Sequence, residues 1–418
     1  FGISTSRKFI FDAMAVKLGG KDVMATSLYP KEGNPLWEQY STRVVAHTLK
    51  SYSKYTFDYP YPKAVSVNAQ DQGMEYPMIC WNFGRPEKDG TTPESTKYGM
   101  IGVIIHEVGH NYFPMIVNSD ERQWSWMDEG LNTFLQYLTE LEFQADFPTR
   151  RGPAKLIVPY MSGEQSGLEP IMTNSENIRQ FGNNAYAKPA TGLNILREVV
   201  MGKELFDFAF KTYANRWKFK HPTPEDFFRT MEDASAVDLD WFWRGWFYTT
   251  WVNDIGIKEV KSFVVTDKAP AGIKVEQPSR RNRFNLEGKM VYMVEDSNGK
   301  TKALKIEDIK PLEEYLKSNF TAEERTKLKT PNYFYQVTFD KPGELVMPIL
   351  VELTFEDGTT ENHSFPAQIW RLNDKEVSRV FATEKKISKI VIDPKLLTAD
   401  IDVTNNTWPK ETLKSKFD

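Results

Sequence analysis

The stretch VIIHEVGHNYF, residues 103–113, holds His106 and His110, two of the five histidines in the chain. On a helix, residues four apart lie on the same face, so both imidazoles can reach one metal ion. Glu107 is rotated by about 100° from His106, where it can approach a metal-bound water without binding the metal. The alternative is a solvated polar helix turn. The apolar neighbours disfavour it, because buried imidazoles and carboxylates need partners.

A catalytic zinc usually has three protein ligands and one open position. In SWMDEGLNTF, residues 125–134, Glu129 follows His110 after eighteen intervening residues, at the start of the next helical pattern. A turn and an antiparallel return would bring that helix beside the first. We therefore predict one Zn²⁺ per chain, bound by Glu129 and the two histidines. Asp128 is the competing acid, because a carboxylate in the first turn of a helix is favoured by the helix dipole.

HEVGH, the eighteen-residue gap and the glutamate of WMDEG resemble the zinc aminopeptidase family of alanyl aminopeptidase and leukotriene hydrolase, the HExxH-x18-E gluzincins. QGMEYP at 72–77 resembles the G-x-M-E-N loop of that family, whose glutamate binds the free α-amino group of the substrate. The resemblance gives this role to Glu75. AYAKPATGLNILREVV at 185–200 resembles the Y-x-K-G-A segment, whose tyrosine hydrogen-bonds the oxyanion. That role falls on Tyr186.

The resemblance implies a zinc-dependent aminopeptidase that hydrolyses the N-terminal peptide bond of unblocked peptides through a zinc-activated water. Glu107 would accept the proton of the water and deliver it to the leaving amine. Tyr186 and the zinc would share the negative charge of the tetrahedral intermediate. Glu75 would fix the substrate α-ammonium, which distinguishes an aminopeptidase from an endopeptidase. Thr133, one turn after Glu129, is a candidate for supporting the ligands.

Some positions depart from the family pattern. Tyr76 replaces the loop asparagine, and Pro189 replaces the glycine after the lysine, which is acceptable at the first position of a helix. Two other functions remain open: a thermolysin-like zinc endopeptidase, or a peptide-binding or scaffold relative with weak or no catalysis. The first would leave Glu75 without a purpose, and the second is disfavoured because every catalytic position is filled. Tyr186 could also be a packing residue, and Glu75 could pair with an arginine.

Helical periodicity dominates the first part of the chain, with short strand-like runs at AVSVNAQ and MEYPMICWN. The predicted helices are residues 34–55, 98–117, 125–144, 189–201, 203–217, 224–234 and 239–250. The resemblance makes this half a thermolysin-like, mainly α-helical zinc peptidase catalytic domain over residues 1–254. SRKFIFDA, near its beginning, resembles the end of the family's N-terminal β-domain and the start of its catalytic domain.

After about residue 255 the pattern changes to strand-like runs such as KMVYMVED and YFYQVTF. Turn signals stand at Asn298-Gly299 and Asp357-Gly358, and one charged helical stretch lies at about 306–328. We predict a β-rich, sandwich-like domain over residues 255–418. The fold class is therefore α+β, with a helical catalytic domain followed by a sandwich.

Composition limits the partners. The net charge of −4, with 53 basic and 57 acidic residues and no basic run, excludes a nucleic-acid surface. No apolar stretch approaches the length of a membrane span, and the single Cys80 excludes an intrachain disulfide.

The expected partner is a peptide with a free N-terminus. Because the chain begins with Phe1 and not with Met, we expect that a preceding segment has been removed, and the resemblance implies that the family's N-terminal β-domain is missing from it. Resemblance to exported bacterial members favours a periplasmic or secreted location.

Overall fold

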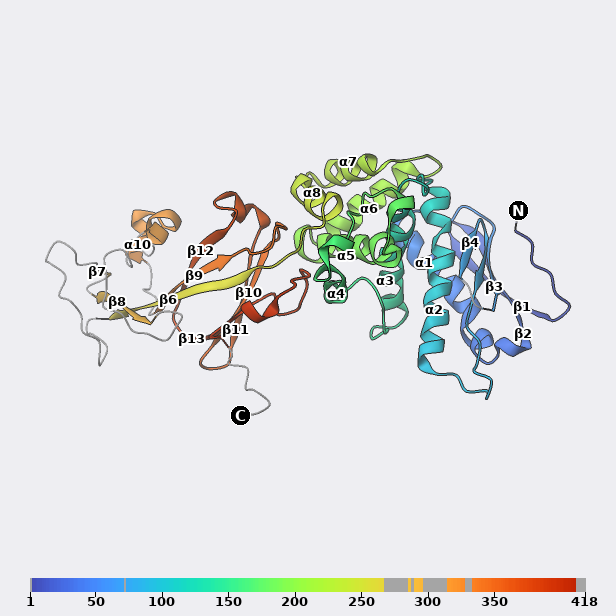
Figure 1. Ribbon diagram of the computed structural model, residues 1–418, viewed down its shortest axis with the longest axis horizontal. Helices are drawn as coiled ribbons and strands as arrows, with labels where there is room; N and C mark the ends of the chain where they lie inside the picture. Colours follow the sequence, from blue (N-terminus) through green and yellow to red (C-terminus); the bar gives the residue numbers. More distant parts are fainter. Residues whose placement is uncertain are drawn as a thin grey trace. The chain divides into compact units, whose positions relative to one another are not determined.

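The computed structural model describes residues 2–70, 73–266, 285–286, 289–295, 314–327 and 333–410. The chain forms two compact units, Phe1–Thr250 and Trp251–Asp418 (Figure 1). The sequence analysis placed the boundary at residue 254, and the structure places it at residue 250. Among the described residues, no helix combines the length and the apolar character that crossing a membrane requires.

A mixed five-stranded sheet in the order β1-β2-β3-β5-β4 belongs to the first unit (Figure 1). Its strands are β1 (Phe9–Leu18), β2 (Lys21–Pro30), β3 (Lys63–Asn68), β4 (Met74–Tyr76) and β5 (Ile79–Asn82). β2, β3 and β5 run parallel, whereas the two edge strands, β1 and β4, are antiparallel to their neighbours. The two strand-like runs predicted near residues 64–82 are therefore confirmed.

The hairpin of β1 and β2 was not predicted from the sequence, which assigned SRKFIFDA to the end of a preceding domain. Leu18 pairs with Lys21, so Gly19 and Gly20 form a two-residue loop, with φ of +54° and +78°. Such a loop needs positive φ at both positions, which glycine adopts without a steric penalty. β1 shows no clean alternation of buried and exposed residues, which removed the usual strand signal. The Gly-Gly pair between two apolar runs was the signal that could have revealed it.

Seven helices of eight residues or more were found in the described part of the first unit. They are α1 (Thr42–Tyr55), α2 (Glu94–Gly109), α3 (Leu131–Phe143), α5 (Lys188–Ile195), α6 (Lys203–Trp217), α7 (Pro224–Ser235) and α8 (Asp240–Tyr248). α1 packs on β1 and β2, α2 packs on β5, and both contact α3 (Figure 1). Apart from the segment 98–117, the predicted helical segments are confirmed, and Pro189 lies in the first turn of α5, where it is tolerated.

The helix predicted over residues 98–117 is shorter than expected. α2 ends at Gly109, and a π-helical segment, Asn111–Ile116, follows it. Pro114 lies inside that segment, and Phe113 has an extended backbone with φ of −133°. Proline lacks the N–H that an α-helix needs, and it disfavours helical geometry in the residue before it. The chain then turns and returns as α3, as the ligand spacing predicted.

Gly109 lets three helices meet closely behind the histidines. A Cβ at this position would lie 2.3 Å from Asn132 Oδ1 on α3 and 2.3 Å from the Tyr52 hydroxyl on α1. The Tyr52 hydroxyl in turn donates to Asn132 Oδ1 over 2.7 Å. The absence of a side chain at Gly109 therefore sets the distance between α2 and its two neighbours.

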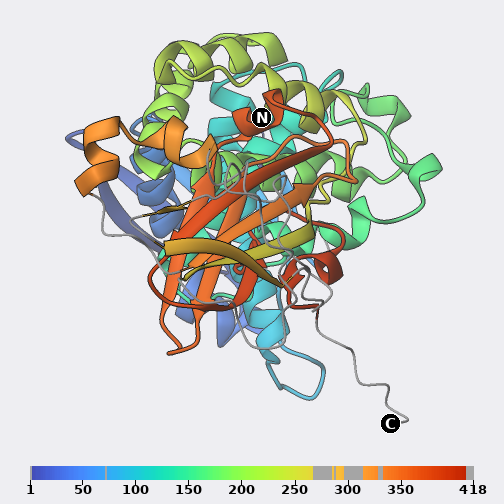
Figure 2. The same cartoon turned by 90° about the vertical axis from the view of Figure 1, so that its left-hand side faces the viewer.

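The second unit contains two sheets, which pack face to face as a sandwich (Figure 2). Tyr335 joins them: its ring lies 6.3 Å from that of Trp408, and its hydroxyl accepts from Ile387 N over 2.9 Å. Phe339 and Phe365 also meet across the layers.

One sheet has the order β11-β10-β13-β14 and the other β12-β9-β6-β8-β7. The strands are β6 (Gly256–Thr266), β7 (Asn285–Leu286), β8 (Lys289–Glu295), β9 (Tyr333–Asp340), β10 (Ile349–Phe355), β11 (Thr360–Phe365), β12 (Glu376–Thr383), β13 (Ile387–Ile392) and β14 (Thr407–Trp408).

The sandwich expectation is confirmed, and so is the turn at Asp357-Gly358, where Gly358 has a φ of +80° between β10 and β11. The predicted charged helix is helical over residues 314–319 and in α10 (Ala322–Lys327). Residues 306–313 and the Asn298-Gly299 turn lie outside the described residues. β12 was not predicted, because its buried and exposed residues do not alternate regularly.

Candidate active site

Three side chains from two helical segments converge at the end of α2. His106 Nε2 lies 3.0 Å from His110 Nε2 and 3.0 Å from Glu129 Oε2. Glu129 Oε2 is also 3.3 Å from His110 Nε2. Glu129 lies in the π-helical turn Trp126–Gly130, which leads directly into α3. The structure therefore brings together the three residues that the sequence spacing nominated as metal ligands.

The hydrogen bonds of the two imidazoles fit a metal site. His106 Nδ1 lies 2.9 Å from Gln136 Oε1, and His110 Nδ1 lies 2.9 Å from the Phe113 carbonyl. Both partners can only accept, so each Nδ1 carries a hydrogen and each neutral imidazole keeps an Nε2 lone pair. In this neutral form the two Nε2 lone pairs and the Glu129 carboxylate oxygen face one another, as the ligands of a single cation would. Two imidazole nitrogens and one carboxylate oxygen form a set that suits zinc.

Neighbouring side chains hold the ligands in place. Asp128 Oδ1 lies 2.9 Å from His110 Nδ1, and Asn132 Nδ2 donates to the His106 carbonyl over 2.8 Å. The sequence nominated Thr133 for support. However, its buried hydroxyl has no hydrogen-bond partner among the described residues. Gln136, seven residues after Glu129 and on the same face of the helix, takes that position.

Glu107 lies beside the cluster and not among its ligand atoms, as its position on the helix predicted. Its carboxyl is buried, and a Cβ on Gly73 would lie 2.3 Å from Glu107 Oε1, so the backbone before β4 covers it closely. Burial, together with the nearby Glu75 carboxylate, raises the pKa of Glu107 to about 8, although His110 opposes the shift. A carboxyl with a pKa near neutrality can both accept and return a proton.

Glu75 lies on β4, at the edge of the sheet. One of its carboxylate oxygens lies within 4.8 Å of ligand-type atoms of His110 and Asp128. No basic side chain forms an ion pair with Glu75 among the described residues. It borders a cavity of about 920 Å³ together with Tyr76 and Trp124. A carboxylate without a cationic partner beside the cluster is available to a cationic group of a ligand.

Tyr186 comes from the π-helical turn Gly182–Ala187 that precedes α5. Its ring stacks on the His106 imidazole, with centroids 5.6 Å apart and planes at 18°. The guanidinium of Arg151 lies 4.4 Å from the ring centroid on this tyrosine. Burial, and then the Glu129 carboxylate, raise the pKa of Tyr186, whereas Arg151 lowers it. The phenol therefore stays protonated and can donate a hydrogen bond.

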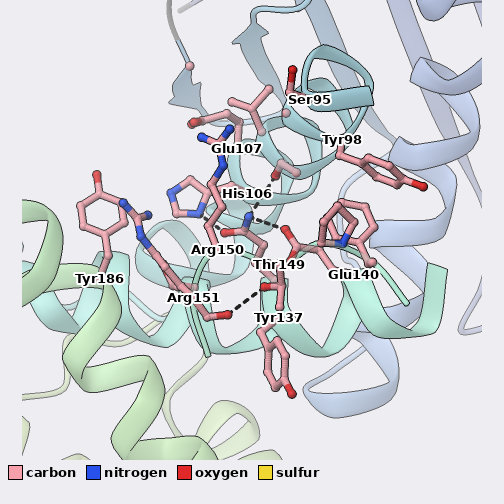
Figure 3. A pocket seen from close by; sticks show the side chains of 18 of the residues that line it. Ser95, Tyr98, His106, Glu107, Tyr137, Glu140, Thr149, Arg150, Arg151 and Tyr186 are labelled. Carbon is pink, nitrogen blue, oxygen red and sulfur yellow. Dashed lines mark hydrogen bonds between the residues drawn. The ribbon is translucent and has the colours of Figure 1, made fainter. Parts of the chain in front are cut away.

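A second cavity, of about 550 Å³, adjoins His106, Glu107 and Tyr186 (Figure 3). Gly73 lines this cavity, whereas the next two residues, Met74 and Glu75 on β4, line the 920 Å³ cavity. The two cavities are therefore bordered by neighbouring residues of the same short segment. Apart from Thr133, the sequence analysis missed the remaining polar residues of the 550 Å³ cavity. Chief among them are Glu140 from α3 and Arg150 and Arg151 from the loop that follows it.

Comparisons with known proteins show which proteins this chain is similar to. Residues 40–246, about half of the chain, match the Peptidase family M1 domain. Aminopeptidase 2, mitochondrial, of Saccharomyces cerevisiae is 24% identical over 228 residues, which cover 51% of this chain and 23% of that protein. Probable aminopeptidase 1 of Sulfurisphaera tokodaii is 25% identical over 222 residues, 50% of this chain and 28% of that protein. The chain thus spans less than a third of the length of either relative.

The fold is also found in a solved structure. The crystal structure of Legionella pneumophila aminopeptidase A in complex with aspartic acid matches with a TM-score of 0.59 at 13% identity. The match covers 94% of this chain and 38% of that one. The helical unit with its mixed sheet and the following β-rich unit therefore form a known architecture, as the predicted fold class required. Through the domain formed by residues 40–246, the chain belongs to the M1 family of metallopeptidases.

Proposed function

We propose that this chain is the catalytic part of a zinc-dependent aminopeptidase that hydrolyses the first peptide bond of unblocked peptides. The observation that supports it most is the convergence of His106, His110 and Glu129. Beside them lies the Glu75 carboxylate, which forms no ion pair with a basic side chain of the described residues. The relatives named aminopeptidases support the same activity. Because the chain spans only 23–28% of their length, their activity is extended to it here as a proposal.

Each proposed role follows from where the side chain lies. His106, His110 and Glu129 would hold the zinc, which lowers the pKa of water and polarises a carbonyl. Glu107 would take a proton from the attacking water at its carboxylate oxygen and return it to the leaving nitrogen. The Tyr186 hydroxyl would donate to the carbonyl oxygen as negative charge develops on that atom.

Glu75 would decide between the two peptidase classes. A substrate ammonium held by this carboxylate places the first peptide bond, and no later one, beside Glu107 and Tyr186. An endopeptidase would gain nothing from an acid at this position, because its substrates carry no charge there. The absence of a basic partner for Glu75 within the described ranges therefore favours the aminopeptidase over the endopeptidase.

The proposal is tested by metal content and turnover in matched variants. We expect about one zinc per chain, and hydrolysis of aminoacyl anilides that a chelator abolishes and zinc restores. Glu107→Gln should keep the zinc and lose activity by about 10²–10⁴-fold, whereas Glu129→Gln should lose both. Glu204→Gln, on the exposed face of α6, is the control and should behave as wild type. A zinc-loaded wild type that cleaves no unblocked substrate would favour the scaffold alternative.

A further inference from the structure

Two arginines reach into the cavity beside Glu107 from the loop that follows α3. Arg150 and Arg151 both line it, and Figure 3 shows their side chains extending towards the wall formed by His106, Glu107 and Tyr186. The Arg151 guanidinium packs over the Tyr186 ring at 4.4 Å. Neither guanidinium forms an ion pair with a carboxylate of the described residues.

For Arg151, this lack of an anionic partner is unusual, whereas Arg150 is exposed to solvent. Arg151 is only partly exposed, and burial lowers the pKa of its guanidinium. A charged group that loses water is normally compensated by an opposite charge. A planar guanidinium is also the side chain best suited to bind a carboxylate with two parallel hydrogen bonds. Arg151, with the exposed Arg150 beside it, therefore offers a site for an anion that the described residues do not supply.

The acid of the same cavity does not fill this role. Glu140 is only 4% exposed, and its Oε1 accepts from Gln136 Nε2 over 2.8 Å. Burial raises the pKa of Glu140 to about 7, although Thr149, Gln136 and the two arginines oppose the shift. Glu140 is therefore partly protonated at neutral pH and hydrogen-bonded to Gln136 and Thr149, which leaves the arginines available.

The position of the cavity indicates which part of a substrate would enter it. If the α-ammonium lies at Glu75 and the scissile carbonyl lies at Tyr186, the residues after the scissile bond continue beyond Glu107. Glu75 borders the 920 Å³ cavity, and Glu107 and Tyr186 border the 550 Å³ cavity. The second cavity therefore receives the leaving part of the peptide, and its volume suits a group of small-molecule size.

We propose that Arg150 and Arg151 bind a carboxylate on the leaving part of the substrate. This inference rests on the proposed aminopeptidase function. The carboxylate is either the C-terminus of a dipeptide or the acidic side chain of the second residue. The enzyme would accordingly prefer dipeptides, or peptides with an acidic second residue, over longer neutral ones.

The test compares substrates that differ only in this carboxylate. One pair is a dipeptide with a glycine second residue, as the free acid and as the C-terminal amide. The other pair is amidated and carries glutamate or glutamine in second place. We expect kcat/KM for at least one charged member to exceed that of its neutral partner by about tenfold or more, since charge-assisted hydrogen bonds are involved. The first pair reports the terminal carboxylate, and the second reports the side chain.

Variants assign the preference to the arginines. Arg150→Gln should bring the charged-to-neutral ratio close to one, and Arg150→Lys, which keeps the charge but not the planar fork, should restore it in part. Arg151→Gln should also lower the ratio, and it should slow both substrates because Arg151 packs on Tyr186. Arg229→Gln, at an exposed position on α7, is the matched control and should leave the ratio unchanged.

A binding measurement separates this inference from the proposed function. In the zinc-loaded Glu107→Gln protein, calorimetry should show the charged peptide binding about tenfold more tightly than its neutral partner. Adding Arg150→Gln should remove that difference. If wild type cleaves unblocked peptides but both members of each pair bind and react equally, the carboxylate site is refuted and the aminopeptidase proposal stands. If nothing is cleaved, the aminopeptidase proposal fails, and equal binding in calorimetry would then refute the carboxylate site separately.

Discussion

At the residue scale, a single substitution separates the packing of Tyr186 from the hydrogen-bond role proposed for its hydroxyl. Its ring contacts both the His106 imidazole and the Arg151 guanidinium, and the residue lines the cavity. Phenylalanine keeps the ring and removes only the donor. The packing alternative and the oxyanion role therefore lead to different outcomes.

Tyr186→Phe should lower kcat by about 10²–10³-fold, the usual cost of losing one donor to a developing oxyanion. Zinc content and the unfolding midpoint should stay close to wild type, because the stacked ring remains. Tyr137→Phe changes another tyrosine of the same cavity and should have little effect. Full activity of Tyr186→Phe would assign this residue to packing alone.

Glu140 makes the stability of the first unit depend on pH. Burial raises its pKa from 4.5 to about 7. Between these values the folded state binds a proton that the unfolded state has released, so stability falls as pH rises from about 4.5 to 7. The shift corresponds to at most roughly 3 kcal/mol. Glu140→Gln carries no such proton and should lose less stability than wild type between pH 5 and pH 8 in denaturant titrations. An identical loss in both proteins would show that Glu140 is not buried as described.

At the element scale, the close approach of α2 to α1 and α3 positions the ligands. Gly109→Ala would place a Cβ 2.3 Å from Asn132 Oδ1, and Asn132 also holds the His106 carbonyl. Overpacking of this kind costs about 1–3 kcal/mol, and zinc affinity should fall with it. Gly99→Ala in the same helix is the control, because its Cβ meets only Phe83 at 3.7 Å. Chemical unfolding and zinc titration of both variants check this, and equal stability would contradict the packing account.

The sequence was most informative where periodicity and spacing carry the information. The HEVGH motif and the eighteen-residue gap predict that Glu129 meets the two histidines, provided that the two helices lie side by side. Hydrophobic periodicity located both helices. The β1–β2 hairpin lacked alternation and was missed. The end of α2 at Gly109 was not predicted, because the sequence does not show that the backbone becomes π-helical and then extended at Phe113, before Pro114.

The rest of the site depends on tertiary contacts that no local pattern encodes. Gln136 and not Thr133 reaches His106, because the rotation of α3 sets which side chain faces the imidazole. Arg150 and Arg151 lie in a loop, and only the folded chain shows that they line the cavity beside Glu107. The role of Asp128 as a partner of His110 likewise needed coordinates, because the sequence favoured a helix-dipole explanation for it.

At the scale of the whole molecule, the two units have separate cores, and the histidine cluster lies in the first. Metal that binds only the folded state stabilises the unit that holds it. In calorimetry, chelation should therefore lower the midpoint of one unfolding transition by several degrees and leave the other unchanged. Zinc should restore the first transition. A chelator effect on both transitions, or on neither, would contradict this division.

The measurement that tests the central claim most directly uses one substrate in two forms, an aminoacyl amide with a free amine and its N-acetylated counterpart. We predict that the zinc-loaded protein cleaves only the free amine and that Glu107→Gln cleaves neither. Glu75→Gln should lose most of the activity on the free amine, because the ammonium loses its carboxylate partner. Cleavage of the acetylated form, or of bonds within blocked peptides, at a comparable rate would contradict the aminopeptidase account and favour an endopeptidase.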